Sequence, residues 1–169
     1  MWSKSILELI GRTPMVELSR VTEGVLPVVL AKVEYFNPGN SSKDRIALKM
    51  IEAAEQAGRL QPGATVVENT SGNTGLAVAM VCVRKGYRCI CVMKDSVSRE
   101  KIDAICALGA EVVLCPAAAP KEDPLSYEST AARLAMEIKG AAHLNQYFNP
   151  ANAQAHYETL GPEIWAQTE

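Results

Sequence analysis

The sequence predicts an α/β fold in which helices flank a parallel β-sheet. Short apolar segments rich in β-branched residues alternate along the chain with segments whose apolar residues recur at helical spacing. Several of the helical segments end in a glycine, at Gly58, Gly86, Gly109 and Gly140, which is the residue favoured just after a helix. Strands that alternate with helices in this way build βαβ units, and the strands of such units are parallel.

Length and composition indicate one soluble globular domain. The chain has 169 residues, 21% of them charged, and a net charge of −2. Lysine and arginine are scattered and do not gather with aromatic residues into a basic patch, so we expect no nucleic-acid partner. No apolar run reaches the length of a membrane span, and no signal-peptide pattern opens the sequence. We therefore expect no membrane partner and a cytoplasmic protein.

The cysteines and histidines do not indicate a metal site or a disulfide framework. The cysteines are Cys82, Cys89, Cys91, Cys106 and Cys115. Their number is odd and no C-x-x-C pair occurs, so we expect all five to be small buried thiols in a reducing compartment. His143 and His156 have no partners at ligand spacing, and we expect no metal.

The first third of the chain contains three predicted elements before the first long helix. Residues Lys4 to Ile10 read as a short helix, Met15 to Leu18 as a short extended piece and Val28 to Tyr35 as a strand. The long helix runs from Ile46 to Ala57.

The remaining elements follow a regular alternation, which predicts the sheet and its covering helices. The predicted strands are Thr65 to Glu68, Cys89 to Met93, Val112 to Cys115 and a last extended run, Ala142 to Tyr147. The predicted helices are Leu76 to Lys85, Ser98 to Leu108, Ser126 to Ile138 and a tail that begins after Asn149-Pro150. The helix Leu76 to Val83 is apolar nearly all round, so it should be buried.

A lysine stands at the start of the first long helix, in the stretch Asn37 to Arg45. Ser41 and Asp44 have the S-x-x-D spacing of a capping box, so we expect Ser41 as N-cap and Lys43 at the second helical position. A helix N-terminus disfavours an ammonium group and so favours a neutral amine, as a lysine nucleophile or base requires. The alternative is an ordinary solvated lysine in the first turn.

A second informative stretch is the loop Thr70 to Gly75, which follows a strand and opens a helix. In an open parallel sheet such a loop lies at the carboxyl ends of the strands, where ligands bind. Helix N–H groups, two glycines, three hydroxyls and an amide suit an anion. The alternative is an ordinary N-cap with turn glycines. The loop lacks the spacing of the dinucleotide fingerprint and of the Walker A loop.

A third stretch, Leu144 to Pro150, places an amide and a phenol, Gln146 and Tyr147, at the end of the last predicted strand. Three strand-to-helix edges therefore converge, one with a lysine, one with an anion cradle and one with the amide and phenol. A lysine opposite a carboxylate-sized anion site suits Schiff-base chemistry on an amino acid.

On these residues the chain resembles the cysteine synthase/cystathionine β-synthase family of pyridoxal 5′-phosphate (PLP) enzymes, fold type II. The matching runs are Ile6 to Pro14, Asn37 to Ala47, Glu68 to Gly75, Gly109 to Val113, Asn149 to Asn152 and His156 to Thr159. They keep their order and span nearly all of the chain. The pair S-x-K-D-R and T-S-G-N-T-G is more specific than either half.

The resemblance implies a role for each site residue. Lys43 would hold PLP covalently and then act as the base that removes the α-proton, and Asn73 would hydrogen-bond the phenolic oxygen of the cofactor. The substrate α-carboxylate would be bound by Thr70, Ser71, Thr74 and Gln146, and Gly72 and Tyr147 would also belong to the substrate-binding residues. The implied reaction is β-replacement, in which a β-leaving group departs from serine or an O-activated serine and a thiol adds.

Within the family, the pair Gln146-Tyr147 resembles the cystathionine β-synthases of transsulfuration, whereas the alternative, a cysteine synthase that joins O-acetylserine and sulfide, more usually has phenylalanine after the glutamine. The resemblance also suggests a homodimer. Three residues depart from the usual pattern: Asn40 stands where glycine is common, Ser42 where an aliphatic residue is common and Asn69 where proline is common. These departures concern the choice of substrate.

Length is the larger departure, because family members continue into a second half with a glycine-rich loop for the PLP phosphate. The resemblance implies an incomplete chain with one three-layer parallel-sheet domain. Residues 1–38 would belong to the larger PLP domain, 39–148 would form the smaller α/β domain, and 149–169 would return toward the larger one. We expect the 169-residue chain alone to bind PLP poorly and to be inactive.

Two further functions compete with this hypothesis. A non-catalytic module would use the loop from Thr70 to Gly75 to bind an anion or a partner protein. A serine or threonine deaminase of the same fold would have other residues around the lysine and in the asparagine loop, and Lys43-Asp44-Arg45 and Asn73-Thr74-Gly75 argue against it.

Overall fold

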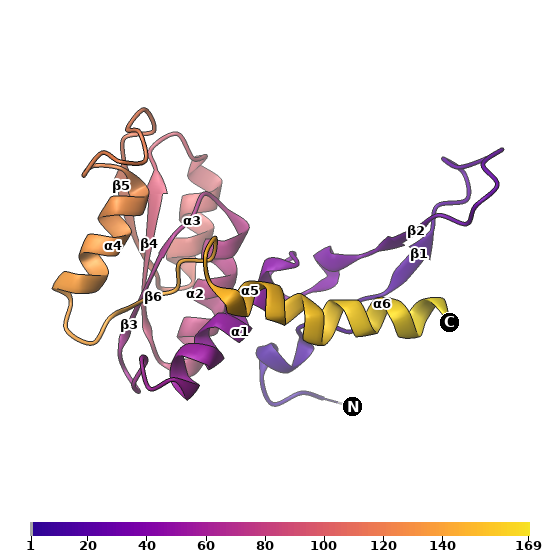
Figure 1. Cartoon of the computed structure of the whole chain (residues 1–169), viewed down its shortest axis with the longest axis horizontal. Helices are drawn as coiled ribbons and strands as arrows, with labels where there is room; N and C mark the ends of the chain where they lie inside the picture. The colour runs from indigo at the N-terminus through magenta and orange to yellow at the C-terminus, as the bar shows by residue number, and fades with distance from the viewer. Residues whose placement is uncertain (1) are drawn as a thin grey trace.

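A four-stranded parallel sheet forms the centre of the structure, a computed structural model that describes residues 2–169 (Figure 1). The strand order is β5-β4-β3-β6, and every neighbouring pair is parallel. The strands are β3 (Thr65–Asn69), β4 (Arg88–Lys94), β5 (Glu111–Cys115) and β6 (Ala142–His143). The predicted parallel sheet of alternating strands and helices is therefore confirmed.

Helices cover both faces of the sheet and make three layers. Helices α2 (Asn73–Lys85) and α3 (Arg99–Ala107) pack on one face, and α4 (Tyr127–Glu137) packs on the other (Figure 1). Outside α2 lie α1 (Lys43–Gln56) and α5 (Pro150–Ala155), which pack against each other. Helix α2 is buried over most of its surface, as its apolar sequence predicts, and ends at Gly86 in the left-handed conformation.

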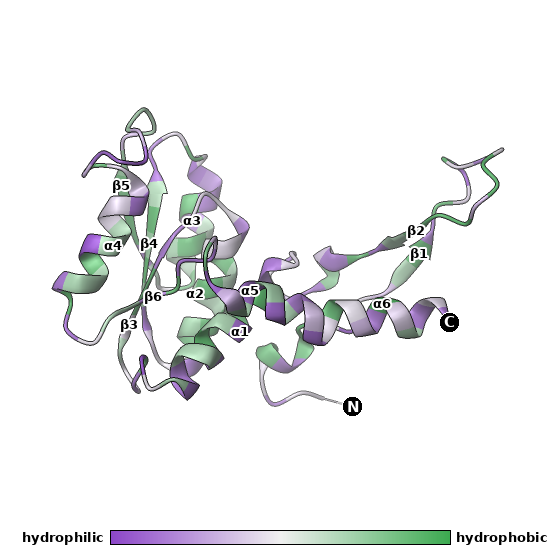
Figure 2. Cartoon of the chain, in the orientation of Figure 1, coloured by the Kyte–Doolittle hydropathy of each residue, from purple (hydrophilic) through white to green (hydrophobic). Residues whose placement is uncertain are grey.

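Two hydrophobic clusters form the core, one on each face of the sheet (Figure 2). On β3, Val66 faces the larger cluster with α1 and α2, and Val67 faces the smaller cluster under α4. A central strand that is buried on both faces needs a continuous apolar run. The next residue, Glu68, is also fully buried, and this exception lies directly below the candidate site.

The topology creates a crevice between β3 and β6. The chain passes outward from β3 through β4 to β5, and then returns by way of α4 to β6 on the other side of β3. Helix α2 leaves β3 on one face, whereas α4, which leads into β6, lies on the other. In open parallel sheets ligands bind at the carboxyl ends of the strands at such a switch point.

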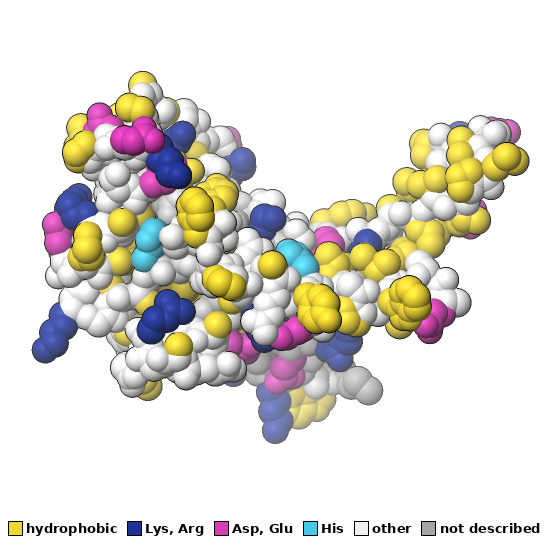
Figure 3. All heavy atoms as spheres, viewed as in Figure 1, with side chains coloured by type: hydrophobic (Ala, Val, Ile, Leu, Met, Phe, Trp, Pro, Cys, Tyr) yellow, Lys and Arg dark blue, Asp and Glu magenta, His cyan; other side chains and the backbone are white. Residues whose placement is uncertain are grey.

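An arm extends from the α/β body (Figure 1). It consists of the antiparallel strands β1 (Met15–Glu17) and β2 (Leu30–Lys32) with the connecting loop 18–29, and of α6 (Gly161–Thr168). A short π-helical segment, His156–Leu160, joins α5 to α6. Apolar side chains gather along the arm (Figure 3), and Val21, Leu26 and Trp165 are mostly exposed.

A buried ion cluster joins the arm to the body. The guanidinium of Arg45, on α1, donates to Glu34 at 2.8 Å and to Glu163, on α6, at 2.7 Å. Lys32 on β2 adds an ion pair to Glu163 at 2.8 Å. The Arg45 side chain is only 1% exposed, so both glutamates balance a charge that water does not reach.

Several predicted elements are wrong in extent. The predicted strand Val28 to Tyr35 is only β2, because β1 offers three residues to pair with, and a 3₁₀ turn follows at Glu34–Phe36. The extended run Ala142 to Tyr147 is only β6, because Asn145 adopts a positive φ of 51° and turns the chain. The predicted helix Lys4 to Ile10 is a 3₁₀ turn, Ile6–Leu9.

The expectation that all five cysteines are buried is also wrong, because Cys106 on α3 is exposed. No helix within residues 2–169 is both long and apolar enough to cross a membrane.

Candidate functional site

A hollow of about 500 Å³ lies at the carboxyl ends of β3 and β6, at the switch point of the sheet. Its walls come from four places along the chain, and its lining residues are Lys43, Thr70, Ser71, Gly72, Asn73, Thr74, Lys101, Gln146, Tyr147 and Asn152. All eight residues that the sequence singles out as site residues therefore line one hollow. The three predicted segments therefore meet, but only two of them follow strands of the parallel sheet, since Lys43 lies on α1 after the separate β1–β2 pair.

Lys43 is the first residue of α1, one position earlier than predicted. Its backbone N–H donates to Ser41 Oγ at 3.1 Å. The capping box itself is wrong, because the Asp44 carboxylate accepts instead from Gly39 N–H at 2.5 Å. Asp44 is fully buried, its Oδ1 has no partner, and burial raises the pKa of the carboxyl. The Pro-Gly turn thus packs against the helix start and fixes where Lys43 emerges.

The turn before Lys43 explains one departure from the family pattern. Asn40 has a φ of 58°, a left-handed conformation that favours glycine and that asparagine tolerates better than most residues. The backbone therefore keeps the shape that glycine would give it, with an amide side chain added.

Thr70 stabilises the loop Thr70 to Gly75, here called the anion loop, through its own side chain. Its Oγ accepts from the backbone N–H groups of Gly72 and Gly75, both at 3.2 Å, and the Thr70 side chain is almost fully buried. Gly75 permits this geometry, because a Cβ there would lie 2.7 Å from the Thr70 methyl carbon and 2.8 Å from a methyl of Ile105. The Thr70 hydroxyl keeps its proton to donate toward the hollow.

Gln146 ties the segments of the site together. Its side-chain Oε1 accepts from the Thr74 hydroxyl at 2.7 Å, and its Nε2 donates to the carbonyl of Asn69 at 3.4 Å. Its backbone carbonyl accepts from Asn152 Nδ2 at 2.9 Å. These bonds connect the end of β3, the start of α2, the turn after β6 and α5, so the amide is held in place before any ligand arrives.

A neutral carboxyl supports the Gln146 turn from below. Glu68 Oε1 accepts from the Gln146 backbone N–H at 3.3 Å, whereas Oε2 has no partner. Burial raises the pKa of Glu68 to about 8, although backbone N–H groups of Gln146 and Asn145 partly offset this rise. The side chain is thus mainly protonated near neutral pH, and the unpartnered oxygen suits the acid proton.

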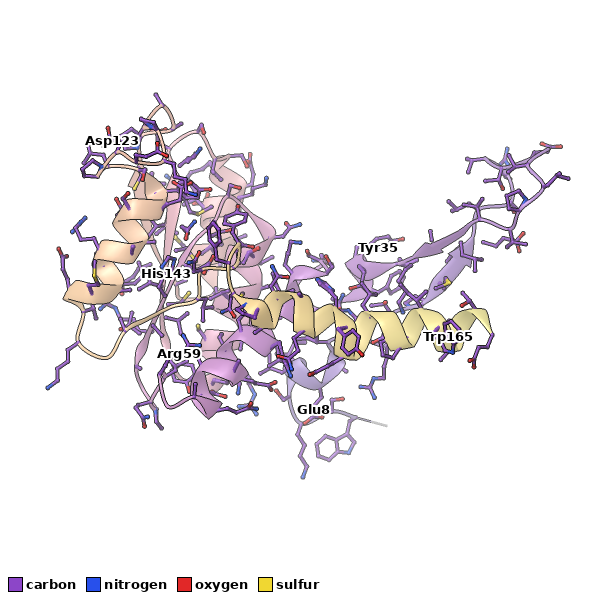
Figure 4. All side chains as sticks on the ribbon, in the orientation of Figure 1. Glu8, Tyr35, Arg59, Asp123, His143 and Trp165 are labelled. Atoms are coloured by element: carbon purple, nitrogen blue, oxygen red, sulfur yellow. The ribbon has the colours of Figure 1, made fainter. Side chains whose placement is uncertain are left out.

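Asn69 connects the two loops at their base. Its Oδ1 lies 2.8 Å from His143 Nε2 on the neighbouring strand β6. Burial lowers the pKa of His143, so the ring is mainly neutral at pH 7 and donates to the amide oxygen. Figure 4 shows His143 in the body, far from Tyr35 and Trp165 on the arm. The asparagine at this position thus gains a contact that proline could not make.

Two lining residues were missed by the sequence analysis. Lys101 comes from the first turn of α3 and Asn152 from the first turn of α5. Asn152 could have been identified from the sequence, since it lies in the run Asn149 to Asn152 that matches the family. Nothing in the sequence marks Lys101 as a site residue, because a lysine in a helix of mixed charge resembles any solvated residue.

The hollow combines a free amine with donors for one carboxylate. Lys43 supplies the amine, and Ser71, Thr74 and Gln146 lie among the hydroxyl and amide groups of the wall. No acidic side chain within residues 2–169 lines it. Such a site can attach a carbonyl compound through its amine and hold an amino acid by its α-carboxylate. No group of three or more potential metal-ligating side chains occurs in the described part of the chain.

The comparisons with known proteins agree on one family. The family model for pyridoxal-phosphate dependent enzymes matches residues 6–169. A cystathionine beta-synthase of Oryctolagus cuniculus is 48% identical over 166 residues, which cover 97% of this chain and 30% of that relative. Cysteine synthase 1 of Emericella nidulans is 48% identical over 163 residues, which cover 96% of this chain and 44% of that relative.

Solved structures give the same result. The crystal structure of O-ureido-L-serine synthase superposes with a TM-score of 0.89 at 43% identity, and covers 98% of this chain and 51% of that one. A hydrogen sulfide-producing enzyme from Fusobacterium nucleatum superposes with a TM-score of 0.88 at 38% identity. The chain thus spans between 30% and 44% of the length of these two curated relatives, and about half of each solved chain.

Proposed function

The chain belongs to the family of pyridoxal-phosphate dependent enzymes, and from this membership we propose that it carries the lysine half of a site for β-replacement on serine or an O-activated serine. In that reaction the hydroxyl or acyloxy group leaves the β-carbon, and the sulfur of a thiol takes its place. The observation that carries the proposal is the convergence of Lys43, the loop from Thr70 to Thr74, and Gln146 on one hollow of about 500 Å³.

The residues present fit PLP. Lys43 is half-buried in the wall, and its ammonium has no ion-pair partner within residues 2–169. Asn73 is exposed at the start of α2, and its side-chain amide makes no hydrogen bond in the described part of the chain. We assign Lys43 to covalent attachment of the cofactor and Asn73 to a hydrogen bond with its phenolic oxygen. When bound, PLP supplies the electron sink that lets the α-proton and a β-leaving group depart from an amino acid.

The remaining steps, substrate binding and proton transfer, fall to the site residues of this chain. Ser71 and Gln146, with the free proton of Thr70, bind the substrate α-carboxylate and orient the α-carbon, and Thr74 holds the Gln146 amide in place for this contact. Lys43 removes the α-proton, which requires its amine to be neutral at that moment.

The partner substrate is proposed to be an amino-acid thiol, as for a cystathionine β-synthase. Tyr147 supports this choice, since it lines the hollow directly beside Gln146 and keeps most of its ring exposed to an incoming molecule. The cysteine synthase reaction is the second candidate, because relatives with both names match at 48% identity. The classification as a lyase of transsulfuration is part of the same proposal.

We further propose that residues 1–38 and 149–169 belong to a larger domain, and that 39–148 form the smaller one. The arm supports this division, because β1, β2 and α6 lie outside the body and expose large apolar side chains such as Leu26 and Trp165 (Figures 1 and 3). A cytoplasmic homodimer is proposed as well; the five free cysteines support the reducing compartment.

The test uses the product of the complete reading frame that contains these residues. It is supplied with PLP and either L-serine with homocysteine or O-acetylserine with sulfide, and the products are measured by mass spectrometry. We expect cystathionine from the first pair and none from the Lys43→Ala variant. Cysteine from the second pair alone would favour the cysteine synthase reaction. No product from either pair would refute the catalytic proposal in favour of a binding module.

A further inference from the structure

The hollow contains two unpaired positive charges. Lys43 and Lys101 are its only charged lining residues in the described part of the chain, and neither forms an ion pair within residues 2–169. By contrast, Lys32, Lys49 and Lys85 each pair with a glutamate at 2.8 Å or less. With Lys43 joined to the cofactor, as proposed above, Lys101 is a cation of the wall that no carboxylate balances, and this suits a ligand that brings negative charge.

Lys101 lies against the anion loop. Its Nζ is 3.7 Å from the position that a Cβ on Gly72 would occupy, and its side-chain carbons lie at 3.9 Å from the same point. Its backbone is in the first turn of α3, where the helix dipole disfavours an ammonium group. Helix stability therefore does not account for a cation at this position.

The carboxylate of the first substrate does not need Lys101. The hydroxyls of Ser71 and Thr70 and the second amide hydrogen of Gln146, which the Thr74 hydroxyl holds in place, suffice for one carboxylate, and the proposed role of Lys43 is covalent. The lining side chains that remain for a second carboxylate are Lys101, the phenol of Tyr147 and the amide of Asn152, whose Nδ2 already donates to the Gln146 carbonyl. Among these three, Lys101 is the cation.

We propose that Lys101 binds the carboxylate of the incoming thiol, and so selects an amino-acid thiol over inorganic sulfide. This inference rests on the proposed function, and names which of its two nucleophile classes the site takes. Lys101 acts in binding only and takes no part in bond making. Since it is exposed, its attraction for a carboxylate is modest and falls as salt rises.

The test measures binding to the 169-residue chain with two ligands that differ in one charge. S-(3-carboxypropyl)-L-cysteine carries the distal carboxylate at the reach that an amino-acid thiol would give it, and S-butyl-L-cysteine has a methyl group in its place. Each is titrated while the amide resonance of Gly72 is followed by NMR. We expect the carboxylate ligand to bind about fivefold more tightly at low salt, and this preference to disappear in Lys101→Gln.

Two further variants separate a direct contact from a general effect. Lys101→Arg keeps the charge and should keep most of the preference, whereas Lys139→Gln removes an exposed charge outside the hollow and should leave it unchanged. If Lys101→Gln keeps the preference, or weakens both ligands equally, the role of Lys101 is refuted while the proposed function stands. If neither ligand shifts Gly72 in the unaltered chain, the role of Lys101 is refuted as well, and the proposed function is decided separately by the product assay on the complete reading frame.

Discussion

Replacing Glu68 by glutamine should make the chain more stable at neutral pH, and the gain should grow with pH. Glu68 is fully buried on the central strand, and one of its two oxygens has no hydrogen-bond partner. Glutamine has nearly the same shape and keeps an oxygen to accept from the Gln146 N–H. The substitution therefore removes the titrating proton and leaves the packing in place.

The magnitude follows from the difference in proton binding. Burial raises the pKa of Glu68 from 4.5 to about 8, so between these values the folded chain holds a proton that the unfolded chain has released. Stability from this residue is fully present below pH 4.5 and is lost as pH rises toward 8. The loss is about 1.4 kcal/mol per pH unit over this window, or roughly 3 kcal/mol from pH 5 to pH 7.

The measurement is the free energy of unfolding in urea at intervals from pH 5 to pH 9. We expect the curve of Glu68→Gln to separate from that of the unaltered chain as pH rises, and the gap to stop growing above about pH 8. Glu122→Gln, at an exposed position, controls for the change in net charge. Parallel curves for the Glu68 variant and the unaltered chain would show that the carboxyl is not held neutral, and would refute the reasoning.

Three further predictions concern the ion cluster and the anion loop. Arg45→Met should lower the free energy of unfolding by about 3–5 kcal/mol, because it leaves Glu34 and Glu163 without their shared cation in a buried place; urea titration checks this, and a loss below 1 kcal/mol would contradict it. Salt bridges and hydrogen bonds, led by that to Arg45, outweigh burial and lower the pKa of Glu163 to about 2, so this residue contributes stability above pH 4.5 that is lost as pH falls toward 2. Glu163→Gln should flatten that part of the acid unfolding curve, and an unchanged curve would count against the cluster. Gly75→Ala should lower the free energy of unfolding by about 1–3 kcal/mol in urea titration, because its Cβ would lie 2.7 Å from a side-chain carbon. Gly72→Ala, whose Cβ would have its nearest atom at 3.7 Å, should lower it less. Equal losses in the two variants would argue against the tight packing of the loop.

Much of the body could be predicted from the sequence, because its local signals agree with its packing. Strands such as Cys89 to Met93 are apolar on both faces, since a parallel sheet covered by helices buries both. Gly86 ends α2 in the left-handed conformation that its position predicts. The convergence of the loop Thr70 to Gly75 with Gln146 was also predictable, because β3 and β6 are parallel neighbours whose carboxyl ends share one edge, whereas Lys43 reaches the same edge on α1, which packs against α2.

The errors arise where distant partners decide the local structure. The S-x-x-D spacing predicts that Asp44 caps its own helix, but the backbone of Gly39 packs close enough to take the carboxylate. The β-branched run from Val28 continues past residue 32, whereas its partner β1 has only three residues to offer. Neither the contact with Gly39 nor the length of β1 can be read from the spacing of residues in the sequence.

Lys101 is the lining residue that sequence patterns are least able to predict. It enters the hollow because α3 packs beside α2 and brings its first turn over Gly72. Nothing in the stretch around Lys101 differs from an ordinary charged helix. A residue whose role depends only on packing between two helices has no pattern of its own in the sequence.

The identity of the cofactor lysine is the central claim, and one labelling experiment tests it most directly. The product of the complete reading frame is mixed with PLP and reduced with borohydride, and the modified peptide is located by mass spectrometry. We expect the pyridoxyl group on Lys43, and its loss in Lys43→Ala. A label on Lys101, or a label of equal yield in Lys43→Ala, would contradict it.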